Sequence, residues 1–308
     1  MGMQSGRQVR AALSFVAKPL LLAIILTVVA RALFSSNNDN PEGMRHAETI
    51  DQQGHTTDAQ PRTISRALVV ASTSDLPPHD TAWLSDLPSE WQGSLYNYVT
   101  DKPLSPELAV PANKGNEAMA YMTYIIDHYD ALPDVVLFHH GHRHGWHQAL
   151  DSPDEVRRLR VEYVQKKGYV SLRCLPGCEN VIALADYAVD QSLFPGHGRA
   201  VQLTSLLDDF LDRDDGERVP VRLASPCCAQ FAASREAIQR RPRAWWVSLR
   251  KWLIETPLLS MDSGRLMEYT WHVWLGSESV YCPDFESCQC HVFGIGQCDE
   301  YFALEESM

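Results

Sequence analysis

A cluster of histidines follows an apolar segment near the middle of the chain. Residues 135–138 are continuously apolar, which predicts a short strand that is buried on both faces. The loop that follows contains Gly141 and Gly145 and carries the imidazoles of His139, His140, His142, His144 and His147. Open α/β sheets bind ligands in the loops at the carboxyl ends of their strands, and neutral imidazole is a common metal ligand. This loop is therefore the first candidate for an active site.

A second interpretation of the same loop needs no chemistry. Histidines in a loop that contains glycines follow no fixed ligand spacing, so the loop can equally be a histidine-rich surface segment. In that case Trp146 would anchor the loop to the core. The two interpretations differ only in what the imidazoles face.

The segments around the loop predict an α/β fold with a mostly parallel sheet that is covered by helices. Apolar residues recur at three- and four-residue intervals from Met119 to Tyr129, which predicts an amphipathic helix that begins near Asn113 or Asn116. Further strands are predicted at residues 66–73, 94–99 and 168–172. Further helices are predicted at residues 81–87, 203–211, 243–254 and 263–276.

The charge balance argues against one class of partner. The chain has 308 residues, which is enough to bury a large core, and a formal net charge of −12. The first 34 residues contain four basic and no acidic side chains, so the rest of the chain is more acidic still. An acidic surface repels phosphate backbones, and we expect no nucleic-acid partner. The chain also lacks a nucleophile elbow, a P-loop and a GxGxxG fingerprint, which argues against hydrolases, NTPases and dinucleotide enzymes.

The N-terminal part predicts a membrane anchor. Residues 11–34 are almost wholly apolar and long enough to cross a bilayer. The basic residues near them favour a cytoplasmic tail at residues 1–10 and a body on the other side of the membrane. Residues 35–65 contain no aromatic residue and predict a flexible stem, and residues 66–308 would then form a lumenal α/β domain. We expect a single-pass membrane protein of the secretory pathway, in the Golgi or the endoplasmic reticulum lumen; a signal peptide cleaved near residues 30–32 is the alternative.

All eight cysteines lie in the expected lumenal domain. An even number of cysteines in an oxidising compartment favours disulfides. Cys282, Cys288, Cys290 and Cys298 crowd a cysteine-rich C-terminal tail. Their spacing matches no standard zinc pattern, so we expect the tail to be held by disulfides, and the sequence leaves the pairing open.

Several motifs together resemble a fungal family, the domain-of-unknown-function family 3431. The segments that carry the resemblance are residues 111–119, 124–130, 132–136, 140–147, 227–231, 263–272 and 282–290. They are spread over nearly all of residues 66–300. The resemblance implies a membrane-anchored protein, and it implies little chemistry because the family has no established activity.

A more distant resemblance suggests a reaction. Asn113, Gly115 and Glu117 at the start of a helix, followed by a strand that ends in a polar loop, are similar to the nucleotide-sugar half of GT-A glycosyltransferases. Residues 230–238 resemble the acceptor-side segment of those enzymes. GT-A enzymes usually carry Asp-x-Asp at the strand end to hold a divalent metal against the diphosphate. This chain has two histidines there, which supply no negative charge.

The GT-A resemblance implies a glycosyltransferase-like domain that acts on a glycan or a small molecule, in fungal glycan or secondary-metabolite biosynthesis. His140 and His142 would hold a divalent metal, manganese or zinc. Glu268 would be the base that activates the acceptor hydroxyl, and His147 would be a second catalytic residue. Asn113 and Gly115, at the start of the helix, would contact the nucleotide, and Arg143 would offset the charge of its phosphates. The substrate-binding residues would be Asn113, Gly115, Glu117 and Arg143.

Two other functions fit the same residues. The clustered histidines with Glu117 or Asp134 could form a 2-His-1-carboxylate site, as in a metal-dependent tailoring enzyme, an oxygenase or a cyclase, of a secondary-metabolite pathway. The other alternative is a non-catalytic, membrane-anchored accessory protein. Bound iron or copper would favour the tailoring enzyme, and binding of a nucleotide sugar would favour the transferase. Mutations of the loop without effect on activity or metal binding would favour the accessory protein.

Overall fold

The computed structural model describes residues 62–174, 176, 181–184, 198–212, 215–299 and 301–302. The expected cytoplasmic tail, the expected anchor at residues 11–34 and most of the expected stem lie outside these residues. The described residues contain no helix that is both long enough and apolar enough to cross a membrane. At the start of the described residues, Arg62 and Ser65 bind the buried carboxylate of Asp134.

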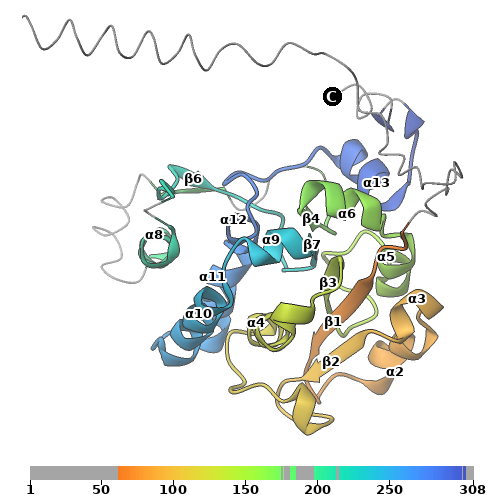
Figure 1. Cartoon of the computed structure of the whole chain (residues 1–308), viewed down its shortest axis with the longest axis horizontal. Coiled ribbons are helices and arrows are strands. Elements are labelled where there is room, and N and C mark those ends of the chain that lie inside the picture. The colour runs from red at the N-terminus through yellow and green to blue at the C-terminus, as the bar shows by residue number, and fades with distance from the viewer. Residues whose placement is uncertain are drawn as a thin grey trace, which may run out of the picture. The chain divides into compact units, whose positions relative to one another are not determined.

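A five-stranded sheet forms the centre of the domain (Figure 1). Its strands lie in the order β2 (Leu95–Val99), β1 (Arg66–Ser72), β3 (Val135–His140), β7 (Phe231–Ser234) and β4 (Tyr169–Ser171). Strand β1 pairs in parallel with β2 and with β3, whereas β7 is antiparallel to β3 and to β4. The prediction of a mostly parallel sheet is therefore confirmed, with one reversed strand inside it.

Strand β7 is the strand of this sheet that the sequence pattern does not reveal. Its residues are one phenylalanine, two alanines and one serine, and alanine has little preference for strands. All of its side chains are buried, and apolar layers cover both of its faces. Burial in the middle of the sheet, rather than local propensity, makes this segment a strand.

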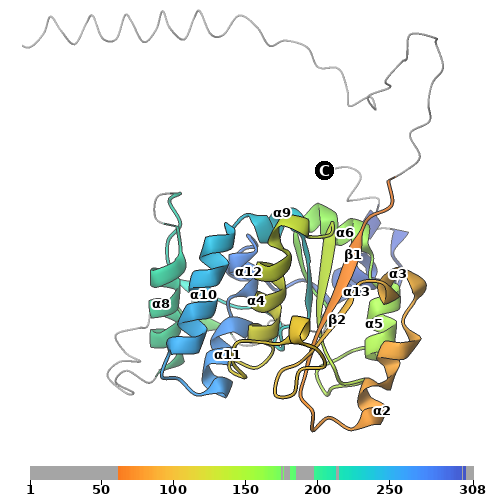
Figure 2. The ribbon, with the colours of Figure 1, turned by 60° about the horizontal axis from the view of Figure 1, so that its bottom comes forward.

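Alternate residues of each strand face opposite sides of the sheet, so an apolar layer forms on each side. On one side, Phe138 packs in the core that includes the buried face of α4 (Glu117–His128). On the other side, Leu137 packs in the core that includes side chains of α5 (Ser152–Arg158) and α6 (Val161–Lys167). Figure 2 shows α4 and α5 on opposite sides of the sheet. The fold is thus a sheet covered by helices, as predicted.

Helices from the C-terminal half extend the layer around α4. They are α8 (Arg199–Phe210), α10 (Arg243–Glu255), α11 (Ser260–Glu268) and α12 (Trp271–Trp274), and α10 packs directly on α4. We expected one helix at residues 263–276, but the chain leaves helical geometry at Thr270, which has a φ of −121°. The hydroxyl of Thr270 donates a hydrogen bond of 2.9 Å to the carbonyl oxygen of Leu266. Such bonds from threonine to the preceding turn bend helices.

The described residues contain further helices and strands. They are α2 (Pro78–Thr81), the 3-10 helices at Ala82–Asp86, Pro106–Leu108 and Tyr129–Ala131, α3 (Ser89–Gln92), β5 (Ile182–Ala183), β6 (Arg222–Leu223), α9 (Arg235–Gln239) and α13 (Phe285–Phe293). The first of the 3-10 helices lies within the helix that was predicted at residues 81–87. Strands β5 and β6 form a separate antiparallel pair.

Disulfides hold the C-terminal tail. A disulfide between Cys174 and Cys288 ties the chain after β4 to α13, and another between Cys290 and Cys298 closes a loop within the tail. Cys282 is also disulfide-bonded. The expectation of a disulfide-bonded tail is therefore confirmed, and no cysteine among the described residues is free.

Candidate functional site

Two adjacent histidines at the end of β3 face opposite sides of the sheet, as neighbouring strand residues must. His139 is fully buried, and its Nε2 lies 2.8 Å from Oε2 of Glu155. Nε2 of Gln230 lies 3.1 Å from the same ring nitrogen, and Gln148 donates to Glu155 at 2.9 Å. His139 therefore belongs to a buried polar network that supports the loop, and His140 is the residue that faces the site.

Three histidines of the loop converge on one point. One ring nitrogen from each of His140, His142 and His147 lies within 4.8 Å of the others. Each ring also has a buried nitrogen without a hydrogen-bond partner, namely Nε2 of His140 and Nδ1 of His142 and His147. Three imidazoles are a donor set that zinc and other divalent transition metals accept, with a further position for water or substrate. These residues could hold a divalent metal.

Burial favours the neutral form of these imidazoles. It lowers the pKa of His140 well below its usual value, and the neighbouring His142, His139 and His147 lower it further. Burial also lowers the pKa of His142, and it lowers the pKa of His147 to about 4. Neutral imidazole is the form that binds metals, so no proton must leave the cluster before a cation binds at neutral pH.

The tight path of the loop depends on its glycines. A Cβ atom on Gly145 would lie 2.5 Å from Cε1 of His147, and one on Gly141 would lie 2.6 Å from Cβ of Ser72. The indole of Trp83 donates a hydrogen bond of 2.9 Å to the carbonyl oxygen of Gly141. Glycine at these positions therefore lets the loop fold back closely enough to bring the imidazoles together.

A pocket of about 280 Å³ lies beside the histidines, at the carboxyl ends of the parallel strands β1, β2 and β3. Hydroxyl and amide side chains line it, together with the N-terminal end of α4. The lining residues are Ala71, Ser72, Thr73, Leu76, Thr100, Asn113, Asn116, Glu117, His140, Gly141, His142 and Ser260. Open α/β sheets usually bind their ligands at this end.

The chain enters α4 through a turn at Gly115. Gly115 has a φ of +73°, and a Cβ atom there would lie 2.6 Å from the buried side chain of Leu253. Its N–H donates a hydrogen bond of 2.8 Å to Oγ of Ser260, so Gly115 shapes the pocket without lining it. Asn113 does line the pocket, where its Oδ1 accepts a hydrogen bond of 3.1 Å from the hydroxyl of Thr100.

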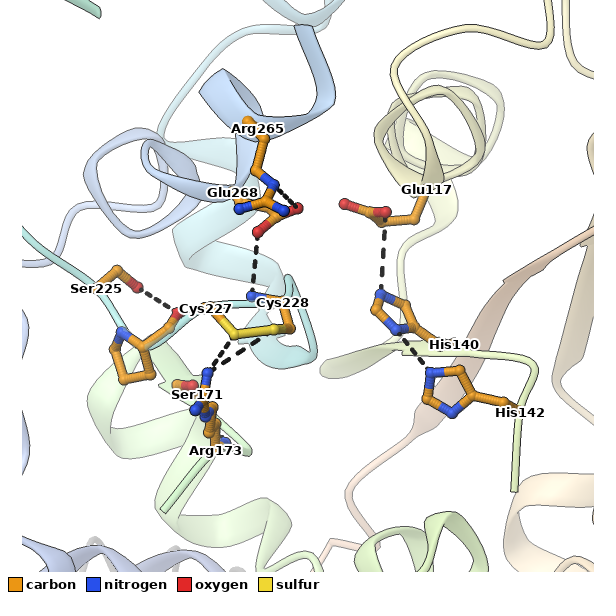
Figure 3. The surroundings of a disulfide bond; sticks show 11 residues. Glu117, His140, His142, Ser171, Arg173, Ser225, Cys227, Cys228, Arg265 and Glu268 are labelled. Carbon is orange, nitrogen blue, oxygen red and sulfur yellow. Dashed lines mark hydrogen bonds and ion pairs between the residues drawn. A yellow bond between two sulfur atoms is a disulfide. The ribbon is translucent and has the colours of Figure 1, made fainter. Parts of the chain in front are cut away.

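Glu117 and Glu268 come from α4 and α11, and their carboxyl groups point toward one another (Figure 3). Oε2 of Glu117 lies 3.9 Å from Nε2 of His140, so this carboxyl group is next to the histidine cluster. Burial, together with the nearby Glu268, raises the pKa of Glu117 to about 8. Burial also raises the pKa of Glu268, against the opposing effect of Arg265. The pair is therefore suited to exchange a proton near neutral pH.

Arg143 lies apart from this pocket. Its Nε is 3.4 Å from Oδ2 of Asp151, and its side chain is half-exposed. Nδ1 of His144 lies 3.0 Å from the other oxygen of the same carboxylate. Both residues of the loop therefore contact Asp151, and Arg143 does not line the pocket.

Asp134 lies at the opposite end of β3 from the histidines. Its carboxylate accepts hydrogen bonds from Ser65, Arg62 and Arg235. This carboxylate therefore does not join the histidine cluster, and Glu117 is the carboxylate that lies beside it.

A disulfide between the neighbouring residues Cys227 and Cys228 is a part of the site that the sequence analysis did not single out (Figure 3). The backbone N–H of Cys228 donates to Oε2 of Glu268 at 3.3 Å, and the guanidinium of Arg173 donates to Sγ of Cys227. The adjacency of the two cysteines in the sequence was the signal that could have revealed it. The disulfide thus links Arg173, near the end of β4, to Glu268.

Trp146 does not anchor the loop to the core. Its side chain is 84% exposed, so this part of the alternative interpretation of the loop is wrong. The guanidinium of Arg173 lies 5.4 Å from the centre of the indole ring, and the ring of His147 lies 5.6 Å from it. An exposed aromatic ring therefore stands beside the histidine cluster.

Comparison with known proteins identifies a family. The family described as "Protein of unknown function (DUF3431)" matches residues 68–291, a range that includes the pocket, the histidine loop and Glu268. No curated protein and no solved structure matches the chain. The family resemblance of the sequence motifs is thereby confirmed, and the chain belongs to the DUF3431 family of proteins of unknown function.

Proposed function

We propose that the domain is a metal-dependent glycosyltransferase, which moves a sugar from a nucleoside diphosphate to a hydroxyl group of a glycan or a small molecule. The observation that carries this proposal is the convergence of His140, His142 and His147 beside a pocket at the start of α4. A sugar donor of this class carries a diphosphate, which is stabilised by cations and by helix N-termini. At this end of the sheet the histidine cluster could hold a cation, and the N-terminal end of α4 lines the pocket beside it.

Of the two expected metals, zinc fits the donor set of the cluster better than manganese, because imidazole suits zinc whereas manganese prefers oxygen ligands. A bound divalent ion would neutralise the charge that develops on the departing diphosphate. Because the three imidazoles are neutral, they would leave the positive charge of such an ion undiminished, unlike aspartate ligands. Arg143 has no part in this proposal, since it pairs with Asp151 outside the pocket.

Glu268 is suited to take the proton of the acceptor hydroxyl. The acceptor oxygen forms a bond to the anomeric carbon of the sugar, the bond from that carbon to the diphosphate oxygen breaks, and the hydroxyl proton passes to the carboxylate. Burial raises the pKa of Glu268, which makes it a stronger base than an exposed glutamate. Glu117 points toward Glu268 (Figure 3) and can share the proton.

Binding and turnover test the proposal. The full-length chain is purified and screened with a panel of nucleotide sugars, with and without Mn²⁺ or Zn²⁺. One nucleotide sugar together with one metal should raise the melting temperature. The same pair should release nucleoside diphosphate when a hydroxyl acceptor is added. A chain that binds a metal but none of the nucleotide sugars would contradict the proposal.

Two variants of the loop provide a matched comparison. His140→Ala/His142→Ala should lose the metal-dependent shift and lower turnover by about a hundredfold or more. His144→Ala should keep both, because His144 lies in the same loop but contacts Asp151. Full turnover by the double variant would show that the loop is not the reaction site.

A metal-dependent tailoring enzyme, an oxygenase or a cyclase, is a second candidate that the position of Glu117 favours. Oε2 of Glu117 lies 3.9 Å from Nε2 of His140, so these two residues with His142 resemble a 2-His-1-carboxylate set. Metal analysis of the purified protein distinguishes the candidates. Iron or copper would favour the tailoring enzyme, and manganese or zinc with a bound nucleotide sugar would favour the transferase.

We also propose that residues 11–34 anchor the chain in a membrane of the secretory pathway, with the α/β domain in the lumen. The disulfides among the described residues support an oxidising compartment. Protease treatment of intact microsomes tests this arrangement. The domain should be protected until detergent is added, and digestion without detergent would contradict the proposal.

A further inference from the structure

The Cys227–Cys228 disulfide lies next to Glu268, the proposed base (Figure 3). The backbone N–H of Cys228 donates to Oε2 of Glu268 at 3.3 Å, and Nε of Arg265 lies 3.9 Å from Oε1. One oxygen of this carboxylate is therefore held by the backbone of the disulfide, and the other lies near a cation. A change in the backbone at Cys228 would release the first of these contacts.

The backbone at Cys228 has an unusual conformation. Cys228 has a φ of 83° and Ala229 a φ of 45°, a region that residues other than glycine rarely adopt. Such conformations persist only where the surrounding structure enforces them. The disulfide closes a small ring that contains the peptide bond between Cys227 and Cys228, so it restricts the backbone there. Without the bond, this segment can relax, and the N–H of Cys228 would then turn away from Glu268.

Arg173 holds the sulfur side of the same disulfide. Its side chain is buried, and its guanidinium donates to Sγ of Cys227 and lies 3.8 Å from Sγ of Cys228. Arg173 follows β4 closely, so the disulfide is connected to the sheet on one side and to Glu268 on the other. Both sets of contacts require the two cysteines to stay in their present arrangement.

We propose that the Cys227–Cys228 disulfide positions Glu268 for catalysis and that its reduction by a dithiol lowers turnover. This inference rests on the proposed function. In the reduction, a thiolate of the dithiol attacks one sulfur, and the other cysteine leaves as a thiolate. The second thiol of the reagent then displaces the first cysteine. The dithiol becomes a disulfide, and two electrons and two protons pass to Cys227 and Cys228.

Two double variants test the positioning role. Cys227→Ser/Cys228→Ser should lower kcat by about tenfold or more, the factor that one hydrogen bond to a charged group supplies. Its KM for the nucleotide sugar and its metal content should stay unchanged, because neither cysteine lines the pocket or belongs to the histidine cluster. Cys290→Ser/Cys298→Ser removes a bridge in the tail and should keep the wild-type kcat. Equal kcat values for the two variants would overturn the inference.

A dithiol titration tests the redox response. Dithiothreitol should lower the kcat of the wild-type chain by the same factor as the Cys227→Ser/Cys228→Ser substitutions. It should leave the residual kcat of that variant unchanged. Equal inhibition of both proteins would mean that another bridge is the sensitive one, and it would overturn the inference.

Carbodiimide labelling of carboxyl groups distinguishes this inference from the proposed function, because it needs no turnover and no variant. Reduction of the wild-type chain should speed the labelling of Glu268. Glu155 is an internal control, since His139 and Gln148 hold it in a buried network. An unchanged labelling rate at Glu268 would overturn the inference, whatever reaction the protein catalyses. Faster labelling without binding of any nucleotide sugar would support the positioning contact and contradict the glycosyltransferase.

Discussion

His139 and His140 are adjacent on β3, yet their imidazoles contact different networks on opposite faces of the sheet. Nε2 of His139 lies 2.8 Å from Oε2 of Glu155, whereas Nε2 of His140 lies 3.9 Å from Oε2 of Glu117 on the pocket side. The alternation of side chains along a strand accounts for this division. Two neighbouring residues of the same type should therefore have separable effects on stability and on function.

Replacing His139 by alanine is expected to destabilise the fold by about 1–3 kcal/mol, because Glu155 would stay buried without its imidazole partner. Replacing His140 by alanine should lower the free energy of unfolding by less than about 1 kcal/mol but abolish metal binding. Urea unfolding of the metal-free proteins measures the first effect, and metal analysis measures the second. Equal losses of stability in the two variants would contradict this division.

Gly115→Ala should destabilise the fold by about 1–3 kcal/mol. Two causes act together, the φ of +73° and the close approach of Leu253 to the added Cβ atom. Leu253→Ala removes the second cause and leaves the first. A double-mutant cycle by urea unfolding should therefore show that the two substitutions together cost less than the sum of their separate costs. Strict additivity would show that Leu253 does not constrain Gly115.

His272 predicts a loss of stability in mild acid. Its side chain is fully buried, and burial lowers its pKa from 6.5 to about 4. A group whose pKa is lower in the folded state stabilises the fold above its unfolded pKa and loses this contribution as the pH falls through the folded pKa. The contribution should therefore disappear between about pH 6.5 and pH 4, and a shift of this size corresponds to about 3 kcal/mol.

His272→Gln separates this effect from those of the other histidines. Glutamine can still donate to the carbonyl oxygen of Ser279, which lies 3.1 Å from Nε2 of His272. Tyr169 and Tyr281 lie near the ring, and burial raises the pKa of both, so neither titrates in this window. Urea unfolding at a series of pH values should show a smaller acid loss in the variant. A difference between wild type and variant that does not change with pH would contradict the prediction.

Arg143→Ala should change kcat/KM by less than about threefold, because a half-exposed pair with Asp151 contributes little. The expectation from the sequence was that Arg143 offsets phosphate charge, and its position outside the pocket does not favour this role. Steady-state kinetics with the nucleotide sugar measure the effect. A hundredfold loss would restore Arg143 as a phosphate-binding residue.

The segments whose structure depends on local pattern could be predicted from the sequence. The apolar runs at residues 66–73 and 135–138 form β1 and β3, and the periodic run after Asn116 forms α4. Strand β7 could not be predicted, since its alanines form a strand only because they are buried between β3 and β4. Local sequence pattern was sufficient to predict β1, β3 and α4, whereas tertiary packing determines the conformation of β7.

The candidate site was predictable by residue type but not by role. The sequence analysis chose His140 over His139 only through the GT-A resemblance, because the roles of the two residues depend on how far β3 extends into the loop. The approach of Glu117 to Glu268 joins two helices that are far apart in the chain, and no local pattern contains it. The pairing of Cys227 with Cys228 was one of many pairings that an even number of cysteines allows.

The place of β7 in the sheet has a consequence for the growing chain. Strand β7 lies between β3 and β4, but the ribosome makes both of these strands before it makes β7. Until residues 231–234 emerge, β3 and β4 each have an edge without its final partner, and such edges favour association with other chains. Pairings between distant segments also form slowly. A nascent chain that stops before residue 231 should therefore be recognised by chaperones and remain sensitive to protease, because its central sheet is still divided into two parts.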